Sequence, residues 1–385
     1  MQKIRFRTAI YLLAFVLSLQ MAIPAYINSS FIEAKFASTN LISILYTLGS
    51  IVTILSLFYL TKTLKRIGNT RLTLALFIIN GLSFGLLTFS NQSNLIILAF
   101  IALLVLGNLI YFNLDIFLEK QTLNDNTGGI RGKYMTTINL AWLISPIIAG
   151  FILEDNNYRN VYFISLLLTV PFLILLGWGF YDFKDPQYEE INFTATFKRL
   201  KKKKDIFNIF ILRTYLSFFY SWMVIYTPIY LHQNIGLDWS QIGIIFTIML
   251  LPFVLLEIPV GKIADKFLGE KEIMNVGIVI LSLATILLSI ISVKTLWVWG
   301  LVLFLTRVGA SLLEITAESY FFKQIDAGDS NIISFFRMST PLAYLLGPLS
   351  ASLVLVFVDF QFIFLVLGII CLTALKFGLE IVDTK

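Results

Sequence analysis

One short connector decides the fold of this chain, and it reads Leu256-Glu257-Ile258-Pro259-Val260-Gly261-Lys262-Ile263-Ala264-Asp265-Lys266-Phe267-Leu268-Gly269-Glu270-Lys271. It follows an apolar run over 242–256 and precedes another over 273–291. A charged connector between two such runs is expected at a membrane surface, between two spanning helices. The two glycines permit close backbone approach and positive φ, and the aspartate suits the start of a helix.

The composition extends this interpretation to the whole chain. Of its 385 residues, 58% are hydrophobic and only 14% are charged. Soluble domains are nearer half apolar and a quarter charged, so a soluble globular protein is excluded. A spanning helix needs about 20 apolar residues. We predict an all-α polytopic membrane protein with about twelve spans, near 8–27, 40–60, 72–89, 95–117, 135–153, 161–181, 208–231, 241–260, 273–292, 296–317, 336–357 and 361–380.

The sequence repeats itself at an offset of about 200 residues, as many transporter sequences do. The copies align at three places: Arg66 and Gly68 with Lys266 and Gly269, the segment 145–150 with 347–352, and Pro24 with Pro228. The repeat predicts two pseudo-symmetric six-helix bundles over 1–181 and 208–385. A polar cytoplasmic linker over 182–207 joins them. A cleaved signal peptide at the N-terminus is disfavoured, because the repeat needs the first helix.

The basic residues set the predicted orientation. Of the 29 Lys and Arg, 23 fall in loops on one side and three on the other, so both termini are expected in the cytoplasm. The net charge of +6 then reflects membrane topology and not nucleic-acid binding. The basic cluster over 198–204, beside a spanning helix, is expected to lie on anionic lipid.

Polar stripes at equivalent positions in the two halves point to a central cavity. The tenth span carries a stripe on one helical face, formed by Arg307, Ser311, Glu314 and Glu318. At an offset of about 203, the fourth span carries Asn108, Tyr111 and Asp115. An ionisable group inside a span costs several kcal/mol and is a functional candidate by default. We therefore predict that both stripes bind substrate or take part in coupling, although a structural ion pair is the alternative.

The first and seventh spans offer further cavity candidates. They are Gln20 and Asn28 in the first, and Arg213, Tyr220, Trp222 and Tyr226 in the seventh. Helix-spaced aromatic residues more often pack against neighbours or lipid than bind a ligand. Catalytic, metal and cofactor sites are not expected, because the chain has one histidine and one cysteine. It also lacks a phosphate-cradling Gly-x-x-x-x-Gly-Lys loop, so direct use of ATP is not expected.

The connector resembles the signature loop of the major facilitator superfamily. That loop has a glycine, then three residues, then Asp followed by Arg or Lys, and then a second glycine with further basic residues. The matching residues are Gly261, Asp265, Lys266 and Gly269, with one extra residue before the second glycine. Two further segments resemble the fifth-helix glycine-proline motif of its antiporters, one holding Pro146 and Gly150, the other Gly347 and Pro348. Proline kinks with small packing residues explain these segments equally well. The resemblance implies a cavity lined by the first, fourth, seventh and tenth helices.

The resemblance also implies a cytoplasmic gate. Its candidate residues are Glu257, Gly261, Asp265, Lys266, Gly269, Arg66, Gly68, Arg131 and Arg337. Asp265 is expected to face Arg131 at the start of the fifth helix. The N-terminal copy has Lys65 where the family has aspartate, so its latch against Arg337 would join like charges. We predict an asymmetric gate that rests mainly on Asp265.

These features predict a secondary active transporter that works by alternating access and is coupled to protons through Glu314 near Arg307. Export is slightly favoured by the aromatic seventh helix and by Gly347-Pro348, as in an antiporter. Import of a sugar or organic acid, or a facilitator, is the alternative, favoured by Gln20, Asn28, Asn108 and Arg307. A membrane enzyme using Asp115, Glu119 and Asp125, or a non-transporting protein, is a less favoured alternative.

The expected partners follow from this function. They are a small-molecule substrate, protons and membrane lipid, with no nucleic acid and no cofactor. The chain is expected to be a monomer in the cytoplasmic (inner) membrane of a bacterium.

Overall fold

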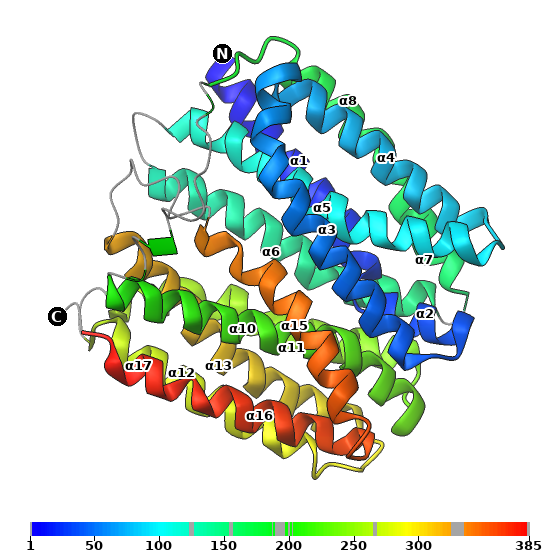
Figure 1. Cartoon of the computed structure of the whole chain (residues 1–385), viewed down its shortest axis with the longest axis vertical. Helices are drawn as coiled ribbons and strands as arrows, with labels where there is room; N and C mark the ends of the chain where they lie inside the picture. Colours follow the sequence, from blue (N-terminus) through cyan, green and yellow to red (C-terminus); the bar gives the residue numbers. More distant parts are fainter. Residues whose placement is uncertain are drawn as a thin grey trace. The chain divides into compact units, whose positions relative to one another are not determined.

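The computed structural model describes residues 2–122, 127–153, 157–186, 188, 197–198, 201, 203–264, 268–324 and 335–382. All regular structure in these ranges is helical. The first half contains α1 (Gln2–Ala25), α2 (Asn28–Phe36), α3 (Thr39–Ile67), α4 (Asn69–Phe89), α5 (Ser93–Thr122), α6 (Thr127–Ile152), α7 (Tyr158–Leu167) and α8 (Thr169–Phe180) (Figure 1). The second contains α10 (Lys204–Ile229), the π-helical turn η1 (Tyr230–Asn234), α11 (Trp239–Ile263), α12 (Glu270–Leu288), α13 (Leu296–Lys323), α15 (Ser339–Val354), the 3-10 turn η3 (Phe360–Phe362), α16 (Ile363–Thr373) and α17 (Leu375–Glu380).

Within the described residues, 11 helical segments are long and apolar enough to cross a membrane. Two of the expected spans are each built from two consecutive helices, α7 with α8 and α16 with α17. The expected span over 336–357 corresponds to α15, which is 16 residues long and is the one that falls short of spanning length. At about 1.5 Å per residue, α15 is about 24 Å long, against a hydrocarbon core of about 30 Å.

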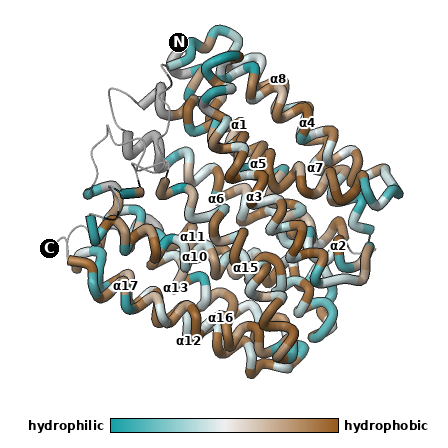
Figure 2. The backbone as a smooth tube through the Cα atoms, in the orientation of Figure 1, coloured by the Kyte–Doolittle hydropathy of each residue, from teal (hydrophilic) through white to brown (hydrophobic). Residues whose placement is uncertain are grey.

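The surface of the helices is apolar, as expected where lipid is the solvent. Figure 2 shows hydrophobic helix middles, with hydrophilic residues gathered at helix ends and connections. Leu82, Ile174 and Phe357 are among the large apolar side chains that are more than 60% exposed. A water-soluble monomer rarely exposes apolar surface on this scale.

The chain divides into two compact units, which are described separately below. Unit 1 contains Met1–Lys35 and Leu48–Ile191, and unit 2 contains Phe36–Thr47 and Asn192–Lys385. Helices at corresponding positions in the two copies of the repeat contact the same partners. In unit 1, α1 contacts α6, and α4 contacts both α5 and α7. In unit 2, the equivalent contacts are those of α10 with α15 and of α12 with both α13 and α16. This common pairing confirms the pseudo-symmetry that the sequence repeat predicts.

The alignment of Gly68 with Gly269 also has a structural counterpart. Gly68 precedes α4 with φ +81°, and Gly269 precedes α12 with φ +78°. Both residues therefore lie in the left-handed region that favours glycine. The same backbone turn starts the third span of each unit.

Each unit has a tightly packed interior. In unit 1, the rings of Phe77 on α4 and Phe172 on α8 stack with centroids 3.5 Å apart. In unit 2, α12 and α13 approach so closely that a Cβ added at Gly277 would lie 2.8 Å from the carbonyl oxygen of Gly309. Small residues at helix crossings permit this backbone contact.

Candidate substrate and coupling site

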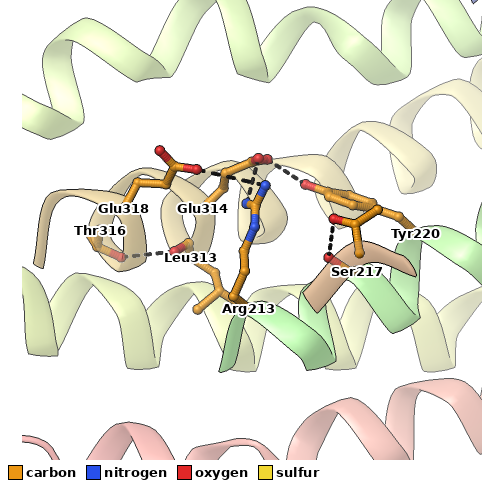
Figure 3. A network of polar contacts seen from close by, with 8 residues as sticks. Arg213, Ser217, Tyr220, Leu313, Glu314, Thr316 and Glu318 are labelled. Atoms are coloured by element: carbon orange, nitrogen blue, oxygen red, sulfur yellow. Dashed lines mark hydrogen bonds and ion pairs between the residues drawn. The ribbon is translucent and has the colours of Figure 1, made fainter. Parts of the chain in front are cut away.

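A cluster of charged and aromatic side chains lies between α10 and α13 of unit 2 (Figure 3). Arg213 and Tyr220 are seven residues apart on α10, so they lie on the same face, two turns apart. Glu314 and Glu318 lie one turn apart on α13. All four belong to segments that are apolar enough to span the membrane.

Glu314 is the centre of this cluster. Arg213 Nη1 donates a hydrogen bond to Glu314 Oε1 over 2.7 Å, and the Tyr220 hydroxyl donates to Oε2 over 2.8 Å. The second guanidinium nitrogen of Arg213, Nη2, lies 3.9 Å from Glu318 Oε1. Both oxygens of Glu314 therefore have a donor, and Arg213 lies between two carboxylates (Figure 3).

Arg307 lies on the same helix as Glu314 but has different neighbours. Its guanidinium carbon is 4.9 Å from the ring centroid of Phe219 and 5.4 Å from that of Tyr220. Only 2% of the residue is exposed, and Nη1 has no hydrogen-bond partner among the described residues. Among the described residues, the cation that pairs with Glu314 is Arg213, and Tyr220 contacts both Glu314 and Arg307. The hydroxyl of Ser311 donates to the carbonyl of Val308 on its own helix.

The aromatic residues of the seventh span are packed into unit 2. Trp222 is 1% exposed, and its neighbour Ser221 lies directly against Gly347 of α15. The Tyr226 hydroxyl contacts the hydroxyl of Ser43 at 2.8 Å and the carbonyl oxygen of Pro348 at 3.3 Å. The Gly347-Pro348 motif thus serves as the packing surface for α10.

Unit 1 carries its polar residues in a different setting. Gln20 is fully buried, and its Nε2 donates to the carbonyl oxygen of Ser165 over 2.9 Å and to Thr169 Oγ1 over 3.1 Å. Its Oε1 accepts from Asn80 Nδ2 over 3.0 Å. Asn28 Oδ1 accepts from the Tyr162 hydroxyl over 2.8 Å. These two predicted cavity residues instead join the helices of unit 1.

The predicted stripe on α5 is less buried. The Tyr111 hydroxyl donates to Ser18 Oγ on α1 over 2.8 Å. Asn108 is exposed and donates to the carbonyl oxygen of Leu104, one turn earlier. Asp115 is half-buried. Of the unit 1 candidates, Asn108 is therefore the one with an exposed amide.

The predicted gate is described only in part. Asp265 and Lys266 lie outside the described residues, as do the side chains of Glu257 and Arg131. Gly261 lies within α11, and Arg66 and Arg337 are exposed. In the fifth span, Pro146 and Gly150 are buried in α6, which continues unbroken through the proline.

Two carboxylates at helix starts are absent from the sequence-based predictions. Asp185 Oδ1, from the segment after α8, accepts the backbone N–H of Asn69 over 2.8 Å and also bonds the Tyr188 hydroxyl. It borders a groove of about 550 Å³ at the start of α4. Glu270, fully buried at the start of α12, pairs with Lys323 and accepts from Ser319 Oγ over 3.0 Å. For Glu270, its position directly after Gly269 was the available signal, since a helix N-terminus favours negative charge. Asp185 is far from Gly68 in the sequence and gave no such signal.

Comparison with known proteins decides the family. The family model of the Major Facilitator Superfamily matches residues 10–328 and 228–381. The chain belongs to the Major Facilitator Superfamily. Membership places it among integral membrane transporters and not in an enzyme family. Within the described residues, no group of three or more His, Cys, Asp or Glu is placed to hold a metal ion.

Transporters with solved structures share the fold of the chain. A point mutant of the nucleoside transporter NupG has a TM-score of 0.77 at 12% identity, covering 97% of this chain and 99% of its own. The POT family transporter PepTSo has a TM-score of 0.79 at 12% identity, covering 97% of each chain. A bacterial homologue of the human lysosomal transporter Spinster, inward-facing and unoccupied, has a TM-score of 0.70 at 9% identity, covering 98% and 93%.

A relative by sequence is the uncharacterized transporter YybO of Bacillus subtilis (strain 168), 30% identical over 142 residues. The match covers 36% of this chain and about a third (32%) of that relative's length. Together with the family model, these similarities establish the superfamily and its fold for this chain.

Proposed function

We propose that this chain is a proton-coupled secondary active transporter that carries a small molecule across the membrane by alternating access. The proposal rests mainly on the contacts of Glu314. Its carboxylate lies within a spanning helix and accepts hydrogen bonds from Arg213 and from Tyr220. Ionisable residues inside spanning helices commonly mark ion and proton pathways in transporters.

The contacts of Glu314 suggest how a proton would act. An ionised Glu314 accepts from both Arg213 and Tyr220. Binding of one proton by the carboxylate removes the charge that holds Arg213, which then has Glu318 as its remaining carboxylate partner, 3.9 Å from Nη2. Release of that proton to the opposite side restores the ion pair. The two protonation states therefore differ in the attraction between α10 and α13, and such a difference is required for coupling.

The direction of transport is a separate part of the proposal. The aromatic seventh helix and Gly347-Pro348 slightly favour export at the level of sequence. In unit 2, Trp222 is buried and Gly347 is in close contact with Ser221, so packing accounts for both features. Import of an organic acid is the second candidate, and it is supported by the buried, charged Arg307. Uptake into right-side-out vesicles, compared with inside-out vesicles, would distinguish the two directions.

The proposed setting is a bacterial cytoplasmic membrane, with the chain as a monomer and both termini in the cytoplasm. The excess of basic residues on one side supports this orientation. Cysteine labelling at the two termini of intact cells would test the orientation, and native electrophoresis in detergent would test the monomeric state.

Coupling can be tested in proteoliposomes that contain a pH-sensitive dye. Glucose, succinate, dialanine and tetraphenylphosphonium represent sugars, acids, peptides and cationic drugs. We expect one class to change the internal pH when it is added to wild-type vesicles. Glu314→Gln, which keeps the shape but cannot ionise, is expected to abolish that change.

Glu380→Gln is the matched control for this experiment. Glu380 forms an exposed pair with Lys204, with the nitrogen and oxygen 3.3 Å apart, so it is a carboxylate–cation pair of unit 2 outside the cluster. The control variant should behave as wild type. If proton movement in Glu314→Gln equalled that of the wild type, the coupling role of Glu314 would be refuted. If the rate of substrate flux did not change with an imposed pH gradient, the protein would be a facilitator and not a proton-coupled transporter.

A further inference from the structure

We infer that Arg307 binds an anionic group of the substrate, a carboxylate or a phosphate, and that the proposed transporter therefore carries an organic anion. This inference rests on the proposed transport function and specifies its substrate class. It depends on the surroundings of one side chain in unit 2.

Arg307 carries a charge that the described residues do not neutralise. An arginine remains protonated at any physiological pH, and a buried charge is costly unless an opposite charge pairs with it. Arg307 is 2% exposed. No described carboxylate forms an ion pair with it, and its Nη1 is buried without a hydrogen-bond partner in the described part of the chain.

The nearby polar groups of unit 2 are engaged elsewhere. Both oxygens of Glu314 are occupied by Arg213 and Tyr220, and Glu318 faces Arg213. Beside Arg307 on α13, the hydroxyls of Thr306 and Ser311 donate to carbonyls of their own helix. An internal anion for Arg307 is therefore missing from the described residues.

The contacts that Arg307 does make hold its guanidinium without using its N–H groups. The rings of Phe219 and Tyr220 lie within 5.4 Å of the guanidinium carbon. A cation stacked on aromatic rings is attracted through its charge and its flat face. The N–H donors at the edges of the guanidinium remain available, and this planar fork matches two oxygens of a carboxylate or phosphate. Arg307 is thus oriented in advance for an anion.

The inference can be tested by equilibrium binding to the purified full chain in detergent, at constant ionic strength. The probes are succinate, lactate and glycerol 3-phosphate, each beside a neutral counterpart: succinamide, lactamide and glycerol. A ligand that binds only the folded protein raises its unfolding temperature. We expect at least one anion, and no neutral counterpart, to raise the unfolding temperature of the wild type.

Two variants assign the effect to Arg307. Arg307→Gln should lose the shift entirely. Arg71→Gln, which removes an exposed arginine of unit 1 outside the predicted gate, should keep it. An equal response of wild type and Arg307→Gln to every anion, including no response from either, would overturn the inference. An equal shift by the neutral counterparts would also overturn it.

If Arg307→Gln does not fold, two milder changes decide the question. Arg307→Lys keeps the charge without the planar fork, and Phe219→Leu removes one of the two rings that orient the guanidinium. Each is expected to weaken anion binding several-fold. Unchanged anion affinity in both variants would contradict the inference.

The outcomes for the inference and for the proposed function remain separable, because this binding needs no gradient. Arg307-dependent anion binding without proton movement in vesicles would refute only the proton-coupled function. Glu314-dependent proton movement driven by a neutral molecule would refute only the anion inference.

Discussion

The two units share a fold but differ in the chemistry of their interiors. In unit 1, the buried polar residues around α1 are uncharged, with Gln20 bonded to Asn80 and to Thr169. In unit 2, the related helix α10 contributes Arg213 to an ion pair with Glu314. The helix pairing is the same in both units. Unit 1 also has an ion pair, between Arg5 and Asp182, but Arg5 lies near the start of α1 and not in its apolar middle. The difference teaches that the repeated fold does not require charge in the middle of a span, so the charges of unit 2 there need a reason other than the fold.

A second contrast appears where the third span of each unit begins. Gly68 and Gly269 have the same positive φ, but their carboxylate neighbours differ. At α4 the carboxylate is Asp185, more than a hundred residues away, and it accepts the backbone N–H of Asn69. At α12 it is Glu270, within the first turn, and it pairs with Lys323 of α13. Both arrangements place negative charge at a helix N-terminus, where the helix dipole favours it.

The largest expected effect comes from breaking the charged cluster of unit 2. Arg213→Met leaves Glu314 and Glu318 without their shared cation. Removing one partner of a fully buried pair costs about 3 kcal/mol, and this partly buried pair, with side chains 17% and 26% exposed, is expected to cost about 2 kcal/mol. Tyr162→Phe in unit 1 removes one neutral hydrogen bond, the one to Asn28, which is worth about 1 kcal/mol. Thermal unfolding in the same detergent should rank Arg213→Met as clearly less stable.

A double variant sharpens this first comparison. Arg213→Met combined with Glu314→Leu removes both charges and should recover part of the lost stability, because an apolar pair of similar volume suits a low-dielectric interior. If Tyr162→Phe proved as damaging as Arg213→Met, the distinction between neutral and charged contacts inside the spans would have no energetic meaning.

The next largest effect should separate the two helix-starting glycines. Alanine at a left-handed position costs about 1–2 kcal/mol, so Gly68→Ala and Gly269→Ala should both lower the unfolding temperature. Gly68→Ala should be worse, because its new Cβ would lie 2.6 Å from Asp185 Oδ2.

Two further variants control this comparison of the glycines. Gly85→Ala, in the middle of α4 with open space around it, should leave the stability unchanged or raise it. Adding Asp185→Ala to Gly68→Ala should remove the excess over Gly269→Ala. If Gly68→Ala and Gly269→Ala lowered the unfolding temperature equally, with or without Asp185→Ala, the Asp185 carboxylate would not restrict the residue at position 68.

A smaller effect is expected from two matched tyrosines. Tyr220→Phe keeps the ring beside Arg307 but removes the hydrogen bond to Glu314, and Tyr111→Phe removes the bond to Ser18. Each should cost about 1 kcal/mol. In the proteoliposome assay, Tyr220→Phe should weaken proton movement and Tyr111→Phe should not. Equal transport losses would place coupling in both units.

The smallest effect concerns the pH dependence at the start of α4. Burial, together with Asp185, raises the pKa of Tyr188. Below the unfolded pKa of about 10, the folded and unfolded forms are both protonated and no pH dependence arises. Above it, the unfolded form ionises first, so the contribution of Tyr188 to stability is lost as the pH rises. Comparison with Tyr188→Phe between about pH 8 and 11 should show a shallower decline in the variant.

The fold was predictable because its signals are local. Apolar runs near twenty residues long, the repeat and the glycines of the connector specify the helices and their pairing. The boundaries were less exact, as α15 illustrates: its 16 residues make it shorter than the expected span over 336–357. The helix pairs α7 with α8 and α16 with α17 also appear as breaks inside single apolar runs.

For the site, the sequence predicts which residues share one face of a helix, but not which residues of other helices they contact. The seven residues from Arg307 to Glu314 place both on one side of α13, yet about 10 Å apart along its axis. Their side chains therefore meet residues of other helices, and nothing in one sequence specifies that Arg213 is the partner of Glu314. The hydrogen bonds of Gln20 were hidden for the same reason, since its partner Asn80 lies 60 residues away on α4 and becomes apparent only in the folded unit.

The backbone contact between α12 and α13 has a consequence for biogenesis. The two helices are joined by the short connection 289–295, and their glycines leave no room for lipid between them. Glu270 at the start of this hairpin is neutralised by Lys323 at its end. Inserted alone, α12 would bring an unpaired carboxylate to the bilayer. If the two helices leave the translocon together, Lys323 is present to pair with Glu270 as the hairpin enters the bilayer.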